Sequence, residues 1–212
     1  MTTKPRVNIY VDGFNFYYGC LRGTPYRWLD LGAFFRTIFP NYTINRIRYF
    51  TALVNSTPQD PDKTIRQQTY LRALETVPSL SVHLGRFSTQ VKRRYLASPE
   101  SNATPTKVSV VEHEEKGSDV NLASYLLVDG FAGEYDVAIV VSNDSDLAEP
   151  IRLARSHIGG KVGLLNPRKH TAFDLLNIAD FYQRVRRGPL SASQFPPTLT
   201  DANGTITKPI GW

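Results

Sequence analysis

Short apolar runs recur along the chain and predict the strands of a sheet. Residues 6–11 read RVNIYV and stop at Asp12-Gly13, which predicts a strand buried on both faces that ends in a turn. The run DVAIVVS at 136–142 is the strongest of these segments. By the same pattern, further strands are predicted at 45–54, 81–86, 161–165 and 181–185.

Stretches with apolar residues at helical spacing separate these runs. Asp30 and Ser118 stand where N-caps belong, ahead of helices predicted at 31–39 and 119–128. Other helices are predicted at 63–77, from Ser145 or Asp146 through 157, and at 171–178, while the aromatic stretch 14–23 predicts a turn into a short helix or loop. Strands that alternate with helices predict right-handed crossovers and an α/β fold, with a mainly parallel sheet covered on both faces.

Two regions depart from this alternation. Residues 87–115 contain two extended segments around the polar stretch PESNATPT, which predicts a hairpin-like insertion with a mobile tip. From residue 188 onward the periodicity is lost, and we expect an extended tail in which the closing Trp212 docks somewhere on the body. We therefore expect one domain over residues 1–187, with the insertion at about 87–115, and a tail over 188–212.

Composition narrows the class of protein. A chain of 212 residues and 23.9 kDa with 41% hydrophobic residues is long enough for one α/β domain with a core. No run of eighteen apolar residues and no secretory leader pattern occurs, so we expect a cytoplasmic protein with no membrane partner. Cys20 is the single cysteine, which excludes an internal disulfide.

Net charge suggests a polyanionic partner. Lys and Arg total 25 against 19 Asp and Glu, giving a net charge of +6 and a pI near 9.5. The basic residues cluster at Lys92-Arg93-Arg94, at Arg168-Lys169 and at 184–187.

Acidic residues stand at the ends of predicted strands. Asp12 ends the first strand, Asp144 and Asp146 follow the strongest one, and Asp119 opens a helix after the insertion. If those two strands are neighbours, all four carboxylates can share one rim of the sheet, where ligands of open parallel sheets collect. Oxygen-only sites suit Mg²⁺ or Mn²⁺, which can support phosphodiester cleavage. Taken singly, each aspartate also fits a plain turn or helix-cap role.

Other chemistries fail on spacing. A dehalogenase-type phosphatase needs Asp-x-Asp after the first strand, but Phe14 holds the second place. An EF-hand starting at Asp144 fails because Ala148 and Pro150 occupy ligand and turn positions. Neither Gly-x-Gly-x-x-Gly nor a P-loop is present, so we expect no nucleotide cofactor.

Three segments together resemble a known family. VDGFN at 11–15, EKGSDV at 115–120 and VSNDSDL at 141–147 are similar to the three signatures of the NYN domain. That family is a PIN-like group of predicted metal-dependent ribonucleases that includes the bacterial LabA/DUF88 type. The resemblance spans about residues 7–185, and three linked motifs are far more specific than one. Asn143 departs from the pattern, because the family more often has glycine there.

The resemblance implies a three-layer α/β/α PIN-like fold with Mg²⁺ or Mn²⁺ among Asp12, Asp119, Asp144 and Asp146. It also implies that Asn15 orients the first carboxylate and that Ser142 supports the ligands without touching the ion. Lys116 matches the lysine of the family's Lys-Gly-x-Asp stretch and would face a phosphate, although a plain solvent-facing lysine fits equally well.

The resulting hypothesis is a metal-dependent nuclease for single-stranded or flexible RNA. The backbone would be held by Lys92, Arg93, Arg94, Arg168 and Lys169, and bases could stack on Tyr17, Tyr18 or Tyr95. Two alternatives stay open: a catalytically silent RNA-binding or scaffold module, and a Toprim-like phosphotransfer enzyme using Asp144 and Asp146. The latter would want a glutamate where Asp12 stands. The sequence also leaves a homodimer open.

Overall fold

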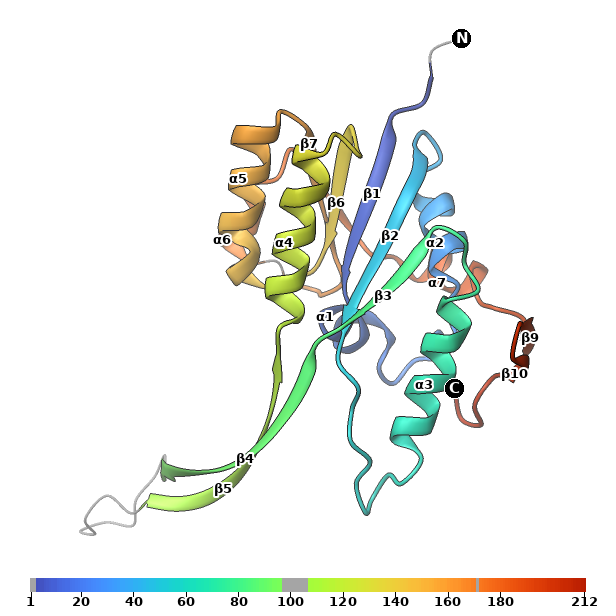
Figure 1. The fold of residues 1–212 in the computed structure, drawn as a ribbon, viewed down its shortest axis with the longest axis vertical. Coiled ribbons are helices and arrows are strands. Elements are labelled where there is room, and N and C mark those ends of the chain that lie inside the picture. Colours follow the sequence, from blue (N-terminus) through green and yellow to red (C-terminus); the bar gives the residue numbers. More distant parts are fainter. Residues whose placement is uncertain (1–2, 97–106, 171) are drawn as a thin grey trace.

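A six-stranded parallel sheet forms the centre of the molecule. The computed structural model describes residues 3–96, 107–170 and 172–212. Its main sheet has the strand order β3-β2-β1-β6-β7-β8, and every neighbouring pair runs parallel (Figure 1). The strands are β1 (Arg6–Asp12), β2 (Thr43–Thr51), β3 (Leu80–Leu84), β6 (Val137–Val141), β7 (Lys161–Asn166) and β8 (Phe181–Arg184).

Helices cover both faces of the sheet, which confirms the predicted three-layer α/β/α architecture. Helices α2 (Leu31–Ile38) and α3 (Lys63–Leu74) lie on one face, and α4 (Ser118–Phe131) and α5 (Ala148–Ile158) lie on the other (Figure 1). Alternation along β1 builds both cores, because Ile9 and Val11 pack toward the first pair of helices and Tyr10 toward the second. The short α6 (Phe173–Leu176) adds Leu175 to the second core.

The predicted neighbourhood of the two key strands is confirmed. Strand β1 pairs with β6 in parallel, with Val11 opposite Val141, so both strands end at the same edge of the sheet. Strand β1 is flanked by β2 on its other side and is therefore central. The residues that follow β1 and β6 are consequently attached to the two middle strands of the sheet.

Several predicted boundaries shift. Asp30 caps α2 as expected, since its side chain accepts a hydrogen bond from the Ala33 amide at 2.9 Å. Ser118 is not the N-cap of α4 but its first residue, and Gly117, at φ 95°, holds the cap position. Glycine tolerates this left-handed conformation, which lets the chain turn sharply from strand into helix. The helix expected at 171–178 covers only Phe173–Leu176, and residue 171 lies outside the described residues.

The insertion is a two-stranded antiparallel arm. Strands β4 (Arg86–Tyr95) and β5 (Lys107–Lys116) pair along their whole length and project away from the body (Figure 1). This confirms the predicted hairpin. The expected mobile tip falls within residues 97–106, which lie outside the described residues.

The segment after residue 187 is structured, and the expectation of an extended tail is wrong. It forms α7 (Arg187–Ala192) and a hairpin of β9 (Thr198–Asp201) and β10 (Gly204–Thr207). Its apolar residues are spaced too irregularly to show a period, yet Ile206 is buried in the first core and Asp201 pairs with Arg72 at 2.5 Å. Trp212 docks as expected, with its ring 5.4 Å from that of Tyr70. No helix in the described part of the chain is long and apolar enough to cross a membrane.

Candidate functional site

Asp12 ends β1 and is held in place from two sides. Its side chain caps the short helix α1 (Gly13–Phe16), accepting the Asn15 amide at 2.9 Å on Oδ1. The Ser142 hydroxyl donates to Oδ2 at 2.8 Å. The tight turn depends on Gly13, because a Cβ there would meet the Phe50 carbonyl oxygen at 2.7 Å. The sequence Asp-Gly therefore fixes a carboxylate at the end of a central strand.

Asp144 and Asp146 lie on the turn after β6. Asp144 precedes the 3₁₀ turn η2 (Ser145–Leu147) and accepts the Asp146 amide at 3.0 Å. Its own amide donates to the Ser142 hydroxyl oxygen at 3.0 Å. Ser142 thus links Asp12 to the backbone of Asp144 through a single hydroxyl group.

Asp119, the second residue of α4, faces the same rim. Burial, followed by the charges of Asp12, Asp144, Glu115 and Asp146, raises the pKa of Asp119 to about 6. Burial likewise raises the pKa of Asp12, and the charges of Asp144 and Glu115 add to the shift. Asp119 therefore lies close enough to be repelled by the other three predicted aspartates, and Asp12 and Asp144 also repel each other.

Glu115 belongs to this rim as well, and the sequence alone did not single it out. The run of Glu112, Glu114 and Glu115 is most simply interpreted as a solvated charge cluster, although one of the three could join a metal site beside Asp119, and the structure divides it. Glu112 and Glu114 form ion pairs on one face of the arm, whereas the charge of Glu115 acts on Asp12 and Asp119. The twofold alternation of a strand, which places 112 and 114 opposite 115, is the signal that could have separated them.

The predicted nucleic-acid contacts of the arm fall into two groups. Lys92 and Arg94 are paired with Glu112, at 2.8 Å and 2.7 Å, and Lys116 approaches Glu114 at 3.4 Å. Arg93 points to the other face of the ribbon, and the structure records no ion pair for it among the residues it describes. The arm therefore offers one uncommitted cation from the Lys-Arg-Arg run.

Arg168 is brought to the rim through Asn15. The Asn15 side-chain oxygen accepts Arg168 Nε at 3.3 Å and the Asn143 amide at 3.3 Å. The backbone of Asn15, not its side chain, contacts Asp12. Lys169, the next residue, is exposed. A guanidinium group thus lies on the border of an otherwise acidic rim.

The carboxylates suit a hard divalent cation in chemistry but stand somewhat apart. All of the donors are carboxylate oxygens, and no ion pair to Lys or Arg is recorded for the four aspartates within the described ranges. In residues 3–96, 107–170 and 172–212, no three His, Cys, Asp or Glu side chains converge tightly enough to hold an ion as they stand. Mg²⁺ commonly keeps several waters and uses only one or two carboxylates, so an open rim of this kind fits it.

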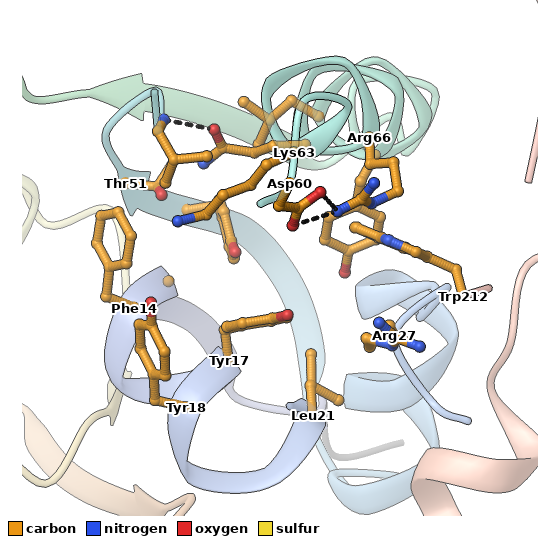
Figure 2. A pocket seen from close by; sticks show the side chains of 16 residues that line it. Phe14, Tyr17, Tyr18, Leu21, Arg27, Thr51, Asp60, Lys63, Arg66 and Trp212 are labelled. Atoms are coloured by element: carbon orange, nitrogen blue, oxygen red, sulfur yellow. Dashed lines mark hydrogen bonds and ion pairs between the residues drawn. The ribbon is translucent and has the colours of Figure 1, made fainter. Parts of the chain in front are cut away.

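A cavity of about 180 Å³ adjoins the rim on the side of α1 (Figure 2). Gly13, which follows Asp12, contributes to its wall, and so does Tyr49, whose pKa is raised by burial and by the charge of Asp12. Aromatic side chains from α1, from the π-helical turn η1 (Tyr17–Leu21) and from the C-terminal segment form much of the lining.

Comparison with known proteins identifies the family and the fold. The NYN domain model matches residues 6–185. The 6-hydroxy-3-succinoylpyridine 3-monooxygenase HspA of Pseudomonas putida is 32% identical over 235 positions, which cover 98% of this chain and 75% of that protein. A Vibrio parahaemolyticus protein of unknown function shares the fold, with a TM-score of 0.57 at 19% identity over 88% of this chain and 96% of its own. The chain therefore belongs to the NYN domain family, whose fold is that of the PIN-like nucleases.

Proposed function

We propose that the protein is a divalent-metal-dependent phosphodiesterase that cleaves single-stranded or flexible RNA. The observation that carries this proposal is the set of four uncompensated carboxylates at the ends of β1 and β6 and at the start of α4. Fold and family are consistent with it, because NYN domains are nuclease-like and typically use divalent metals.

Asp12 and Asp144 are the proposed direct ligands. Each oxygen of Asp12 accepts one hydrogen bond, which leaves further lone pairs for a cation. When bound, Mg²⁺ or Mn²⁺ polarises the phosphate and lowers the pKa of a bound water. Ser142 and the Asn15 amide hold Asp12 in one orientation, so the ligand need not be ordered during the reaction.

Asp119 is the proposed acceptor of the proton from the attacking water, and Asp146 helps to position that water. A general base works best when its pKa lies near the working pH. In the metal-free chain, burial and the neighbouring carboxylates raise the pKa of Asp119 to about 6, above that of an ordinary aspartate. Its place at the start of α4 keeps it at the rim but on a different element from the proposed ligands.

The RNA backbone is proposed to lie between Arg168 and the arm. Arg168 borders the rim through Asn15, and Arg93 is the arm cation without an ion pair among the described residues. Lys92, Arg94 and Lys116 are engaged with glutamates, so their contribution is expected to be smaller. Lys169 extends the positive region beside Arg168.

The test is cleavage of an end-labelled single-stranded RNA in Mn²⁺. Asp12→Asn combined with Asp144→Asn should reduce the rate at least about a hundredfold, because a ligand set acts as a unit. Asp62→Asn, at an exposed aspartate that is not one of the four, is the matched control. Unchanged cleavage by the double variant contradicts the proposal, and equal cleavage of DNA removes the preference for RNA. Inactivity with every divalent metal favours a silent binding module.

The curated relative supplies a second candidate, oxygenation of a small hydroxypyridine acid. The observation that favours it is the aromatic-lined cavity beside Asp12. Oxygen uptake that depends on both 6-hydroxy-3-succinoylpyridine and a two-electron donor such as NADH would support this activity. Failure of the purified protein to consume oxygen under those conditions would remove it.

A further inference from the structure

The cavity between the α1–η1 turn and α3 has the features of a ligand site in its own right. We propose that it binds a planar aromatic ring carrying an anionic group. Nucleoside monophosphates and small aromatic acids share this chemistry. The inference extends the second candidate function above, which places an aromatic acid in this cavity, and it does not depend on any activity of the carboxylate rim.

The walls are suited to a flat ring. Aromatic side chains from α1, from η1 and from the C-terminal segment surround the space: Phe14, Tyr17, Tyr18 and Trp212 (Figure 2). Aromatic side chains bind flat rings by stacking and edge contacts. At about 180 Å³ the cavity is smaller than the roughly 300–1,000 Å³ typical of drug-sized ligands. Its size therefore favours a ring system with a short substituent.

The charges lining the cavity are unbalanced. The side chains that line the cavity include three cations, Lys63, Arg66 and Arg27, and one carboxylate, that of Asp60. Asp60 is committed to Arg66, whose guanidinium contacts both of its oxygens at 2.6 Å. Two cations therefore remain without a carboxylate partner among the lining residues.

Lys63 is the residue best placed to hold the anionic group. Its amine points into the cavity, away from the Asp60–Arg66 pair and toward the side where Phe14 and Thr51 lie (Figure 2). The structure records no ion pair for this amine in the part of the chain that it describes. A half-buried ammonium beside aromatic rings gains most from a partner that brings its own negative charge.

Trp212 and Arg27 bound the opposite side of the cavity. The Arg27 guanidinium lies 5.9 Å from the centre of the Trp212 ring and donates to the Gly211 carbonyl, and no ion pair to an Asp or Glu side chain is recorded for it among the described residues. The Trp212 ring in turn contacts Tyr70. Since the chain has two tryptophans and Trp28 is fully buried, the fluorescence of Trp212 should report an occupant.

The test is a fluorescence and calorimetric titration of the full chain in EDTA, so that the carboxylate rim takes no part. The ligands are AMP, adenosine, ribose 5-phosphate, pyridine-3-carboxylate and pyridine. We expect at least one ring-plus-anion ligand to bind about tenfold more tightly than its ring or its anion alone, as one charge-assisted hydrogen bond predicts. Preference for AMP identifies a nucleotide as the source, and preference for pyridine-3-carboxylate identifies a free aromatic acid.

Variants then locate the binding. Lys63→Gln should weaken it about tenfold, Lys63→Arg should retain most of it, and Lys161→Gln, at an exposed lysine elsewhere, should leave it unchanged. Trp212→Phe should keep the affinity measured by calorimetry and abolish most of the fluorescence change. Equal affinity for AMP and adenosine and for the two pyridines, no saturable binding of any ligand, or full affinity in Lys63→Gln overturns the inference. RNA cleavage is assayed separately, so its failure would bear only on the proposed phosphodiesterase.

Discussion

Two buried aspartates lie on the same α/β framework in opposite electrostatic settings. Asp129 of α4 is 3% exposed and receives both arms of the Arg48 guanidinium, at 2.7 Å and 2.8 Å, together with the Tyr10 hydroxyl at 2.9 Å. Asp12 is 6% exposed and receives only neutral donors, the Asn15 amide and the Ser142 hydroxyl. One carboxylate is neutralised within the fold, and the other is not.

This difference separates an acid that supports the structure from acids that are available for chemistry. A buried charge with a bidentate partner is satisfied, and removing either partner is strongly unfavourable. Carboxylates that only repel one another destabilise the fold until a cation arrives. Such uncompensated groups, with pKa values shifted by burial and by like charges, are typical of functional sites.

The largest expected effect concerns stability. Asp129→Asn should lower the free energy of unfolding by about 3–5 kcal/mol, because it leaves the buried Arg48 guanidinium without its negatively charged partner. Asp12→Asn should change it little or raise it. Urea denaturation followed by circular dichroism measures both values. A combined Arg48→Met and Asp129→Leu variant should recover part of the loss, and similar losses at Asp12 and Asp129 would erase the contrast.

Metal ions should act on one region only. If Mn²⁺ binds at the rim, a concentration a hundred times Kd should stabilise the folded chain by about 2.7 kcal/mol. The resulting rise in melting temperature should disappear in Asp12→Asn combined with Asp144→Asn and persist in Asp62→Asn. Thermal scans with and without Mn²⁺ make the measurement. An equal rise in the double variant would mean that Mn²⁺ binds elsewhere.

The rim should also give the protein a distinctive dependence on pH. The pKa of Asp119 is about 6 in the folded chain, above the ordinary value of 3.8, so between these values the folded state holds more protons than the unfolded state. Its contribution to stability is therefore present below about pH 4 and is lost as the pH rises through about 6. In EDTA, Asp119→Asn should be more stable than wild type at neutral pH, by on the order of 1 kcal/mol after allowance for solvent screening, and equal near pH 4. A constant difference across the range would contradict this origin.

The smallest effect contrasts paired and unpaired cations on the arm. In a background carrying Asp12→Asn and Asp144→Asn, Arg93→Gln should weaken RNA binding about threefold and lower the salt slope by about one. Arg94→Gln should have less effect, since Glu112 already holds Arg94 at 2.7 Å. Filter binding at several salt concentrations gives both quantities. A larger effect at Arg94 would reverse the assignment of the two faces.

Most of the sheet and the rim could be predicted because they follow from local periodicity. Buried strands of parallel sheets are recognisable as apolar runs, and carboxyl ends of neighbouring parallel strands meet, which was enough to bring Asp12 together with Asp144. The partners of Lys92 and Arg94 were not predictable, because they depend on how β4 is registered against β5. The same holds for Glu115, whose side of the ribbon follows from that pairing.

The C-terminal segment shows a different limit. Its hairpin is defined by contacts with residues far away in the chain, such as the Arg72–Asp201 pair at 2.5 Å, and not by a period of its own. The prediction that Ser118 is the N-cap of α4 was wrong for a related reason. Serine is a good N-cap in isolation, but the turn from β5 needs a left-handed backbone conformation, which Gly117 adopts easily.

The arm leaves the body beside the rim, and this has a mechanical consequence. Strand β5 continues through Gly117 directly into α4, while Gly85 at the foot of β4 packs so closely that a Cβ would lie 2.7 Å from the Lys116 carbonyl oxygen. The ribbon thus joins the body through a narrow junction at Gly117, with Glu115 just before that junction and Asp119 just after it. A displacement of the ribbon relative to the body would therefore change the separation of these two acids, because they flank the junction.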